Sequence, residues 1–208
     1  MRPRKSSSVK TNVPGDAGRE RVRDILKESI TALATVLYDD KLVERIEEAA
    51  RILVAALKKG NKILVCGNGG SAADSQHFAA ELTGRFERER RALAAVALTT
   101  DTSSLTALAN DYGYDVVFER PLAALGRRGD VLLVLSTSGR SPSVLKAVQR
   151  ARKMGISTIG LTGKDGGTLR RSAELALVMP AANTARIQEC HSVVIHILCA
   201  IVERAFSR

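Results

Sequence analysis

The chain has 208 residues, of which 45% are apolar and 26% charged, so its length and composition predict a single globular domain around one core. Aromatic residues make up only 3% and Trp is absent, so Leu, Val, Ile and Ala must build that core. No apolar run approaches the roughly 20 residues that span a bilayer, so no membrane-spanning helix is expected.

The first 18 residues, MRPRKSSSVKTNVPGDAG, are basic and rich in Ser. They lack the apolar central region of a secretory signal, so we expect a disordered tail at 1–18 and one domain at 19–208. The net charge is +10, and half of it arises before residue 24. Because no aromatic residue accompanies these charges, a solvated tail is favoured over a segment that binds nucleic acid or a membrane.

The three cysteines, Cys66, Cys190 and Cys199, form no CxxC pair. An odd number without a paired motif favours reduced thiols, and hence a cytoplasmic protein, over a disulfide framework or a zinc ribbon.

Two amphipathic helices are predicted first. Apolar residues recur at helical spacing over 19–38 and again over 41–58, and Gly60 is a suitable C-terminal stop. The first of these helices could pack outside the main domain.

After Gly60, short apolar runs alternate with helical segments. The predicted strands are KILVC, LAAVAL, DVLLVLS, STIGLT and LALVMP, and the predicted helices cover 72–83, 103–110, 114–126, 142–154, 168–172 and 186–206. Continuous apolar strands alternating with helices indicate an α/β fold: a parallel, mostly five-stranded sheet covered on both faces, or three-layer αβα sandwich. Ligands of such sheets bind at the carboxyl ends of strands, where the loops GNGGS, TTDTSS, STSGRS and TGKDGG are rich in Gly, Ser and Thr.

The loop STSGRS has the composition of a phosphate site. It leaves a strand and enters a helix, for which Ser141 is a suitable N-cap and Pro142 a suitable first residue. The helix N-terminus offers unpaired N–H groups and a partial positive charge, and hydroxyls are added by Ser136, Thr137, Ser138 and Ser141. Four hydroxyls in six residues favour phosphate binding over simple capping, while Walker A and GxGxxG motifs are absent.

His77 and Glu81 stand four residues apart, so their side chains can meet on one face of a helix. Asp74 lies one turn earlier and could orient His77. Alone, such a pair is more often a surface hydrogen bond than a metal site.

The other two histidines, His191 and His196, share a strongly apolar helix with Gln188. For each of them the plain alternative is a core histidine that is satisfied by a backbone carbonyl. Spacing pairs Gln188 with His191 and not with His196, which lies about 12 Å further along the helix.

Several ordered motifs resemble the phosphoheptose isomerases, which are sugar-isomerase (SIS) domain proteins. They are CGNGGSAADSQHFAAELTGRF, ANDYGYD, GDVLLVLSTSGRS, LTGKDGG and RIQECHSVVIH, and the resemblance covers about residues 20 to 206. It implies the conversion of sedoheptulose 7-phosphate to D-glycero-D-manno-heptose 7-phosphate, the first step toward the activated heptose of bacterial envelope polysaccharides. It also implies a zinc ion and a homotetramer with active sites at subunit interfaces.

The resemblance also implies a role for each matched residue. The implied zinc ligands are His77, Glu81, Gln188 and His196. The implied sugar-phosphate contacts are Asn68, Gly69, Gly70, Asn110, Asp111, Ser136, Thr137, Ser138, Ser141 and Gln188. The match therefore selects His196, where spacing selects His191. The chain departs from the family at Ala185, a position that is often acidic, so any role of that carboxylate is lost or moved.

The implied chemistry fits these residue types. Isomerisation between aldose and ketose moves a proton between C1 and C2 through an enediol, which requires a base and a group that handles the hydroxyl protons. Glu81 is the candidate base, His196 is the candidate acid/base partner, and zinc would polarise the carbonyl. Because a zinc-bound carboxylate is a poorer base, Glu81 would have to loosen from the metal during turnover.

Two non-enzymatic functions compete with this interpretation. One related SIS protein binds the bacterial replication initiator, and other SIS domains sense sugar phosphates for transcription factors. The initiator-binding relatives lack the matched Glu and the final His, so the presence of Glu81 and His196 favours the enzyme. The short basic stretch before the core is not expected to hold a DNA-binding segment, which disfavours the sensor.

Overall fold

The computed structural model describes residues 15–207. Its first helix, α1, begins at Asp16 and ends at Leu37, so the tail boundary expected at residue 18 is wrong: residues 16–18 form the first turn of that helix. An acidic residue at the helix start, Asp16, suits the partial positive charge there. Residues 1–14 of the expected tail lie outside the described residues.

The five predicted strands are all present and form one sheet in which every neighbouring pair is parallel. The strand order is β2-β1-β3-β4-β5. The strands are β1 (Ile63–Gly67), β2 (Ala95–Ala97), β3 (Val131–Ser136), β4 (Ser157–Gly163) and β5 (Leu175–Met179). β1 and β3 are buried along their whole length, as expected for continuous apolar runs that are covered on both faces.

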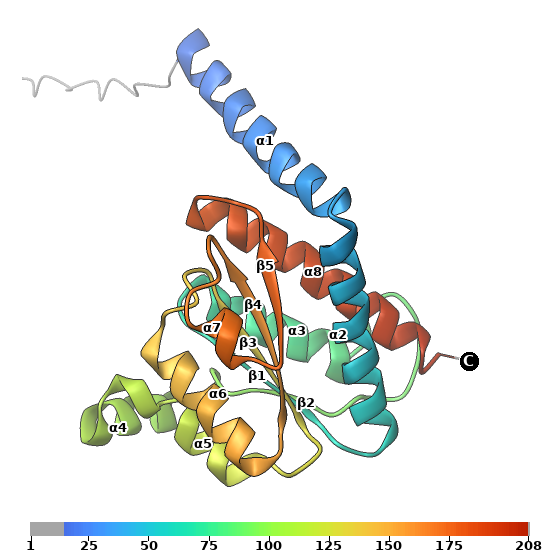
Figure 1. Cartoon of the computed structure of the whole chain (residues 1–208), viewed down its shortest axis with the longest axis vertical. Coiled ribbons are helices and arrows are strands. Elements are labelled where there is room, and N and C mark those ends of the chain that lie inside the picture. The colour runs from blue at the N-terminus through green and yellow to red at the C-terminus, as the bar shows by residue number, and fades with distance from the viewer. Residues whose placement is uncertain (1–14, 208) are drawn as a thin grey trace, which may run out of the picture.

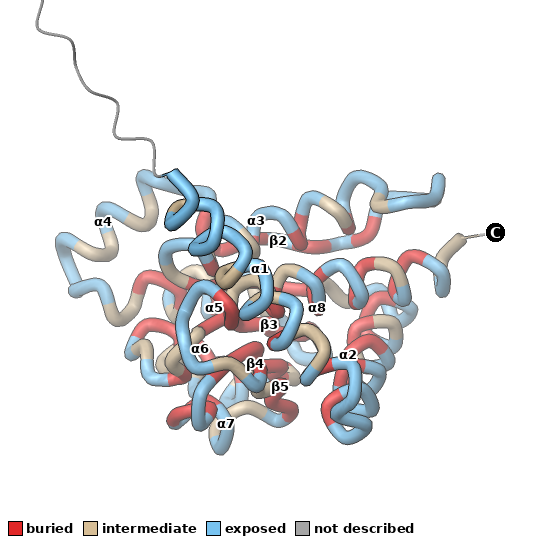
Figure 2. The backbone as a smooth tube through the Cα atoms, turned by 90° about the horizontal axis from the view of Figure 1, so that it is seen from above, coloured by how far each residue is buried: buried red, intermediate tan, exposed pale blue. Residues whose placement is uncertain are grey.

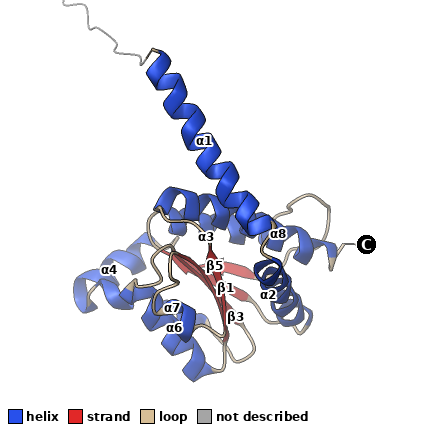
Figure 3. Ribbon diagram, turned by 45° about the horizontal axis from the view of Figure 1, so that its top comes forward, coloured by secondary structure: helices blue, strands red, loops and turns tan. Residues whose placement is uncertain are grey.

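The helices form two layers around this sheet, which confirms the three-layer sandwich (Figure 3). One layer holds α2 (Asp40–Lys58), α3 (Gly70–Thr83) and α8 (Thr184–Arg204). The other holds α4 (Thr102–Tyr112), α5 (Glu119–Leu125), α6 (Pro142–Met154) and α7 (Leu169–Ser172).

Alternate residues of a single strand supply the two cores. On β3, Val131, Leu133 and Leu135 join the core beneath α2, α3 and α8, whereas Leu132 and Val134 join the core beneath α5 and α6. Figure 2 shows the buried residues concentrated along the strands and along the inner sides of the helices.

The helix predicted over 114–126 is wrong as a single element. The structure has a short 3-10 helix, Tyr114–Val116, and then α5 from Glu119. Between them Val117 and Phe118 are buried in the core beneath α5 and α6, so burial of these two side chains divides the segment. Gly113, with a φ of 84°, separates the 3-10 helix from α4.

The first helix extends away from the body of the molecule and leaves much of its apolar side uncovered (Figure 1). Only Ala32 and Val36 of α1 are buried. Large apolar residues that stay exposed on α1 and in the turn after it are Val22, Leu26, Ile30, Leu37 and Tyr38. The expectation that this helix lies outside the main domain is thus confirmed for most of its length.

Helix α8 is the one described helix that is long and apolar enough to cross a membrane. Half of its apolar window is nevertheless buried within the fold, where it packs against α2 and α3. This is the pattern of a core helix.

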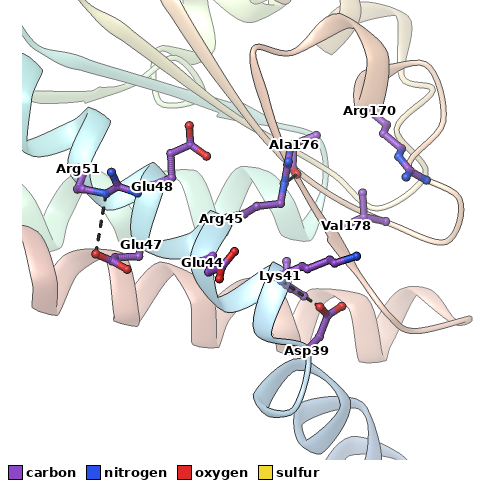
Figure 4. A pocket seen from close by; sticks show the side chains of 11 residues that line it. Asp39, Lys41, Glu44, Arg45, Glu47, Glu48, Arg51, Arg170, Ala176 and Val178 are labelled. Carbon is purple, nitrogen blue, oxygen red and sulfur yellow. Dashed lines mark hydrogen bonds and ion pairs between the residues drawn. The ribbon is translucent and has the colours of Figure 1, made fainter.

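A groove of about 750 Å³ runs between α2 and the edge strand β5 (Figure 4). Arg45 donates from Nε to the backbone oxygen of Ala176 at 2.9 Å, so a side chain of α2 covers part of the free strand edge. Charged residues of both signs line the groove, and none of the predicted site residues lies in it.

Candidate functional site

The predicted site residues gather where the parallel strands end. β1 passes through Asn68 and Gly69 into α3, and β3 passes through the STSGRS loop into α6. β1 and β3 are neighbours in the sheet, and Gly67 pairs with Leu135 in the register. The two loops therefore open at the same edge of the sheet, as the rule for ligand sites in parallel sheets predicts.

The STSGRS loop presents its hydroxyls near the start of α6. The Oγ atoms of Ser136 and Ser141 are 3.3 Å apart, and Ser138 Oγ accepts from the backbone N–H of Arg140 at 3.2 Å. Ser141 is the N-cap residue, but its side chain makes no capping hydrogen bond, so the expected capping role is wrong for the hydroxyl. The hydroxyl faces the loop, and the first N–H groups of α6 are left for another acceptor.

Arg140 is committed to a neighbour. Its Nη1 donates to Asp165 Oδ1 at 3.0 Å and its Nη2 to Asp165 Oδ2 at 2.5 Å, in a bidentate pair between the STSGRS and TGKDGG loops. This pairing lowers the pKa of Asp165 to about 2. The guanidinium therefore holds two loops together and is not a free cation for phosphate.

Asn68 links three segments of the site. Its Nδ2 donates to Ser143 Oγ at 3.0 Å, and its Oδ1 accepts from the Tyr114 hydroxyl at 2.9 Å. Sequence reasoning identified Asn68 but missed Tyr114 and Ser143. The signal for Tyr114 was its place in the ANDYGYD motif, and that for Ser143 was a further hydroxyl in the first turn of α6.

The two glycines after Asn68 are required for different reasons. Gly69 has a φ of 58° and a ψ of −125°, a backbone conformation that disfavours side chains. A Cβ on Gly70 would lie 2.5 Å from Nε2 of Gln188. Gln188 of α8 thus lies directly over the start of α3, next to the glycine loop.

Helices α3 and α8 run side by side in the same direction, and their residues meet in a regular series. Gly70 meets Gln188, and four residues later Asp74 accepts from Ser192 Oγ at 3.2 Å. Both helices advance by about 1.5 Å per residue, so they stay in step, and the next contact joins the imidazoles of His77 and His196. Asp74 is therefore engaged with Ser192 and is not the hydrogen-bond partner of His77 that the sequence suggested. Burial raises the pKa of the Asp74 carboxyl.

The third contact of this series is the candidate metal and acid–base site. The Nε2 atoms of His77 and His196 are 2.9 Å apart, and their rings are nearly perpendicular, with an interplanar angle of 70°. Glu81 Oε1 lies 3.6 Å from His77 Nε2. The structure therefore brings together three of the four predicted zinc ligands from two helices.

This donor set fits zinc in kind, because two imidazole nitrogens and one carboxylate are a common catalytic set for that metal. Over residues 15–207 no group of three or more His, Cys, Asp and Glu side chains is close enough to hold a metal ion as it stands. The two histidines already converge on one point, and closing the set requires Glu81 to approach them.

His191 lies outside this cluster, although spacing favoured it. It is fully buried, and its Nε2 lies 3.2 Å from the backbone oxygen of Thr162 in β4. Desolvation lowers its pKa to about 4, so the ring is neutral at pH 7. The plain alternative of a core histidine bonded to a carbonyl is confirmed for His191, and the selection of His196 by the family motif agrees with the geometry.

Asn110 and Asp111 are not joined to the rest of the site. They lie exposed near the end of α4, where Asn110 Nδ2 donates to Asp111 Oδ1 at 2.8 Å. Ala185 is also exposed, in the first turn of α8.

Comparison with known proteins agrees with this geometry. The SIS domain family matches residues 26–163. The chain is 52% identical over 184 residues to the phosphoheptose isomerase of Aliarcobacter butzleri (strain RM4018), covering 88% of this chain and 97% of the relative. It is 54% identical over 162 residues to that of Campylobacter jejuni subsp. jejuni serotype O:6, covering 78% and 87%. The chain belongs to the phosphoheptose isomerase family of SIS-domain proteins.

Solved structures extend this likeness to the fold. A phosphoheptose isomerase from Neisseria gonorrhoeae is 48% identical with a TM-score of 0.84, and one from Francisella tularensis is 39% identical with a TM-score of 0.86. Each comparison covers 89% of this chain and 98% of the other. The protein is therefore an isomerase, and by its family a sugar-phosphate isomerase, with the fold that the sequence predicts.

Proposed function

We propose that the protein converts sedoheptulose 7-phosphate to D-glycero-D-manno-heptose 7-phosphate. The observation that carries the proposal is the arrangement of two different sites on one seam between α3 and α8. Gln188 and the glycine loop lie at its start, where Asn68 bonds to Ser143 of α6, the helix that the STSGRS loop enters. The His77–His196 pair lies seven residues beyond Gly70, about 10 Å along the helix. This separation suits a substrate whose phosphate and reacting carbons are at opposite ends.

The phosphate is proposed to bind at the STSGRS loop. Ser136, Thr137, Ser138 and Ser141 supply hydroxyls, and the start of α6 supplies free N–H groups with a partial positive charge. No additional cation is required, which agrees with the pairing of Arg140 to Asp165. Further contacts to the sugar are proposed for Asn68, Gly69, Gly70, Asn110, Asp111 and Gln188.

The reaction is proposed to pass through an enediol. Glu81 removes the proton from C1 of the ketose, and the C1–H electrons form the C1–C2 double bond as the C2 carbonyl oxygen gains a proton. His196 handles the hydroxyl protons, so that O1 loses its proton as the C1 carbonyl forms, and C2 receives a proton. Both groups lie in the same cluster, Glu81 half-buried and His196 exposed to solvent.

Zinc is proposed as the cofactor, with His77, Glu81, Gln188 and His196 as the residues that would hold it. The first, second and last of these already lie together, whereas Gln188 lies over Gly70 and its side chain would have to turn toward His196 to join them. When bound, it would polarise the carbonyl and stabilise the enediolate. Because Glu81 is 3.6 Å from His77 Nε2, it is positioned to leave or join the ligand set while remaining in the site. This position reconciles its two proposed roles as a ligand and as a base.

A homotetramer with active sites at subunit interfaces is proposed as the assembly. His77 and His196 are exposed in the single chain, and so are Asn110 and Asp111. Large apolar residues are exposed beside the site on α8, namely Val193, Ile197 and Ile201, and others are exposed along α1. Exposed apolar surface next to an incomplete site is typical of a surface that a second subunit covers. The proposed location is the cytoplasm.

The test is turnover of sedoheptulose 7-phosphate by the purified protein after its metal content has been measured. We expect formation of the heptose 7-phosphate, loss of activity on chelation and recovery with zinc. Binding of sugar phosphate without turnover would instead support a sensor. Binding of the replication initiator without turnover would support the other non-enzymatic relative.

A further inference from the structure

A buried ion pair lies behind the His77–His196 site and takes no part in the proposed chemistry. Glu203 of α8 is 1% exposed, and the side chain of Arg90 is completely buried. Arg90 Nε lies 3.5 Å from Glu203 Oε1, too far for a hydrogen bond, and this nitrogen finds no other partner in the part of the chain that the structure describes. Two buried charges are costly unless hydrogen bonds from other groups satisfy them, so their other hydrogen bonds show what keeps the pair in place.

Those contacts all fix one stretch of chain, residues 84–92, which follows α3. Glu203 accepts three consecutive backbone N–H groups, from Phe86 at 2.9 Å, Glu87 at 2.7 Å and Arg88 at 2.8 Å. These bonds lower the pKa of Glu203 although burial alone would raise it. The carboxylate is therefore charged, and it determines the path of this segment.

Arg90 ties the same segment to the end of α3. Its Nη2 donates to the backbone oxygen of Glu81 at 2.6 Å, and its Nη1 donates to the backbone oxygen of Gly84 at 2.5 Å. The 84–92 segment is thus fastened both to the helix that carries Glu81 and to the helix that carries His196.

The 84–92 segment contacts the His77–His196 site through Phe86. Its ring lies 5.5 Å from the ring of His196, at an angle of 35° between planes. His196 is at the same time edge-on to His77. Phe86 therefore packs against the imidazole that must meet His77, and Glu203 holds the backbone of Phe86.

We propose that Glu203 and Arg90 are positioning residues that orient the His196 imidazole through Phe86. This inference rests on the proposed acid–base and zinc site. The Glu203 carboxylate stands seven residues beyond His196, about 10 Å along α8, so it acts through the segment and not by contact. Mutation of a group that orients a metal-ligating histidine typically lowers metal affinity or activity by about 10- to 100-fold.

The test compares four single variants with the parent. Glu203→Gln removes the charge and leaves one acceptor oxygen, and Phe86→Leu removes the ring but keeps an apolar side chain. Phe86→Tyr keeps the ring, and Glu89→Gln changes an exposed carboxylate of the same segment as the matched control. We expect zinc affinity, measured by competition with a chelator, to fall about 10-fold or more for the first two variants only. We expect kcat to fall for the same two variants, with KM for the sugar phosphate unchanged.

A double variant separates positioning from general stabilisation. If Glu203 acts through Phe86, Glu203→Gln/Phe86→Leu loses no more kcat than the worse single variant, because contacting residues are not additive. If the kcat losses multiply, or if Phe86→Leu keeps both zinc affinity and kcat within two-fold of the parent, the proposal is overturned. Should Glu203→Gln fail to fold, Glu203→Asp replaces it, because the shorter side chain withdraws the carboxylate from the N–H groups of residues 86–88, and unchanged zinc affinity and kcat in that variant overturn the proposal.

A readout without metal or substrate keeps this inference separate from the proposed reaction. The chain has only three histidines, so the His196 ring proton signal can be assigned from the spectrum of His196→Ala. In the zinc-free protein Glu203→Gln must shift this signal as Phe86→Leu does. An unchanged His196 signal in Glu203→Gln contradicts positioning, whereas absent turnover in the parent contradicts only the proposed reaction.

Discussion

The two histidines of α8 have opposite environments although they are five residues apart. His191 faces the sheet and its Nε2 bonds to the Thr162 carbonyl, whereas His196 faces α3 and meets His77. At 3.6 residues per turn, a difference of five residues rotates the side chain well away from the first direction. A single residue type thus serves the core at one position and the site at the other.

We predict that Glu81→Gln and His196→Ala each remove nearly all turnover while leaving the assembly intact. Loss of a positioned acid or base costs about 10²- to 10⁴-fold, and more where the group also holds a metal. Steady-state rates and the native mass of each variant test this. The exposed Glu87→Gln is the control and should match the parent. Rates within a few-fold of the parent for both site variants would show that the assigned mechanism is wrong.

His191 predicts a specific pH dependence of stability. Its pKa is about 4 in the folded chain, below its ordinary value of 6.5, because burial disfavours the charged ring. Above pH 6.5 the ring is neutral in both the folded and the unfolded chain, so it does not lower the free energy of unfolding. Between pH 6.5 and 4 the unfolded chain binds a proton that the folded chain does not, so the free energy of unfolding falls as the pH falls. At about 1.4 kcal/mol per pKa unit, the free energy of unfolding loses about 3 kcal/mol over this range.

The measurement for His191 is urea unfolding followed by circular dichroism at several pH values. His191→Gln keeps a donor for the Thr162 carbonyl and cannot titrate, so its stability should fall less steeply between pH 6.5 and 4 than that of the parent. Parallel curves would show that His191 does not contribute to acid sensitivity.

At the scale of elements, the site is made by strand–loop–helix units and by one pair of parallel helices. The STSGRS loop receives its position from β3 and α6, and its neighbour TGKDGG is tied to it through Arg140 and Asp165. The α3–α8 pair sets the distance between Gln188 and the two histidines. Each of these parts is formed by only two or three elements, and the parallel sheet brings them to the same edge.

For the STSGRS loop we predict that Ser138→Ala raises KM for the sugar phosphate. A hydrogen bond to a charged group contributes about 1.5–3 kcal/mol, which corresponds to about 10- to 100-fold in kcat/KM. Inorganic phosphate should inhibit competitively in the parent. Normal substrate affinity in Ser138→Ala, together with no competition by phosphate, would place the phosphate of the substrate elsewhere.

For Ser141 the structure changes the expected effect on stability. Its hydroxyl makes no capping bond, so Ser141→Ala should cost less than the about 1 kcal/mol that an N-cap side chain supplies. Thermal unfolding compared with Asn183→Ala checks this, because the Asn183 side chain does cap α8 by accepting from Arg186 N–H at 2.9 Å. An equal loss in both variants would show that Ser141 caps after all.

At the scale of the whole molecule, the uncovered face of α1 is the feature that a single chain does not explain. Ile30 is 66% exposed and Leu26 56% exposed on a helix that projects from the body (Figure 1). Burying such residues would stabilise an assembly by about 25 cal/mol for each Å² of apolar surface.

We predict that Ile30→Glu reduces the native mass of the protein, measured by light scattering after gel filtration. A charge in an apolar interface is costly to bury, so the variant should dissociate and lose activity if its sites are shared between subunits. Arg21→Glu, an exposed change on the same helix, is the control. A parent that is monomeric, or an Ile30→Glu variant of unchanged mass, would contradict the proposed assembly.

The sequence by itself determined the sheet, most helices and the loops that carry the site. Continuous apolar runs of Val, Leu and Ile can only be buried on both faces, so KILVC and DVLLVLS predicted interior parallel strands without reference to their neighbours. Gly and Pro marked the element ends for the same local reason, since they restrict the backbone wherever they occur. Where burial of Val117 and Phe118 overrode local helical spacing, the prediction was wrong.

Residue types and spacing left open which polar residues meet, and the tertiary structure decided it. Gln188 and His196 are about 12 Å apart along one helix, and no spacing rule within that helix can join them. A second helix that runs beside it in the same direction supplies Gly70 opposite Gln188 and His77 opposite His196. The link from Glu203 to Phe86 likewise spans 117 residues of sequence. Such contacts depend on the packing of distant segments, which residue types and local periodicity do not encode.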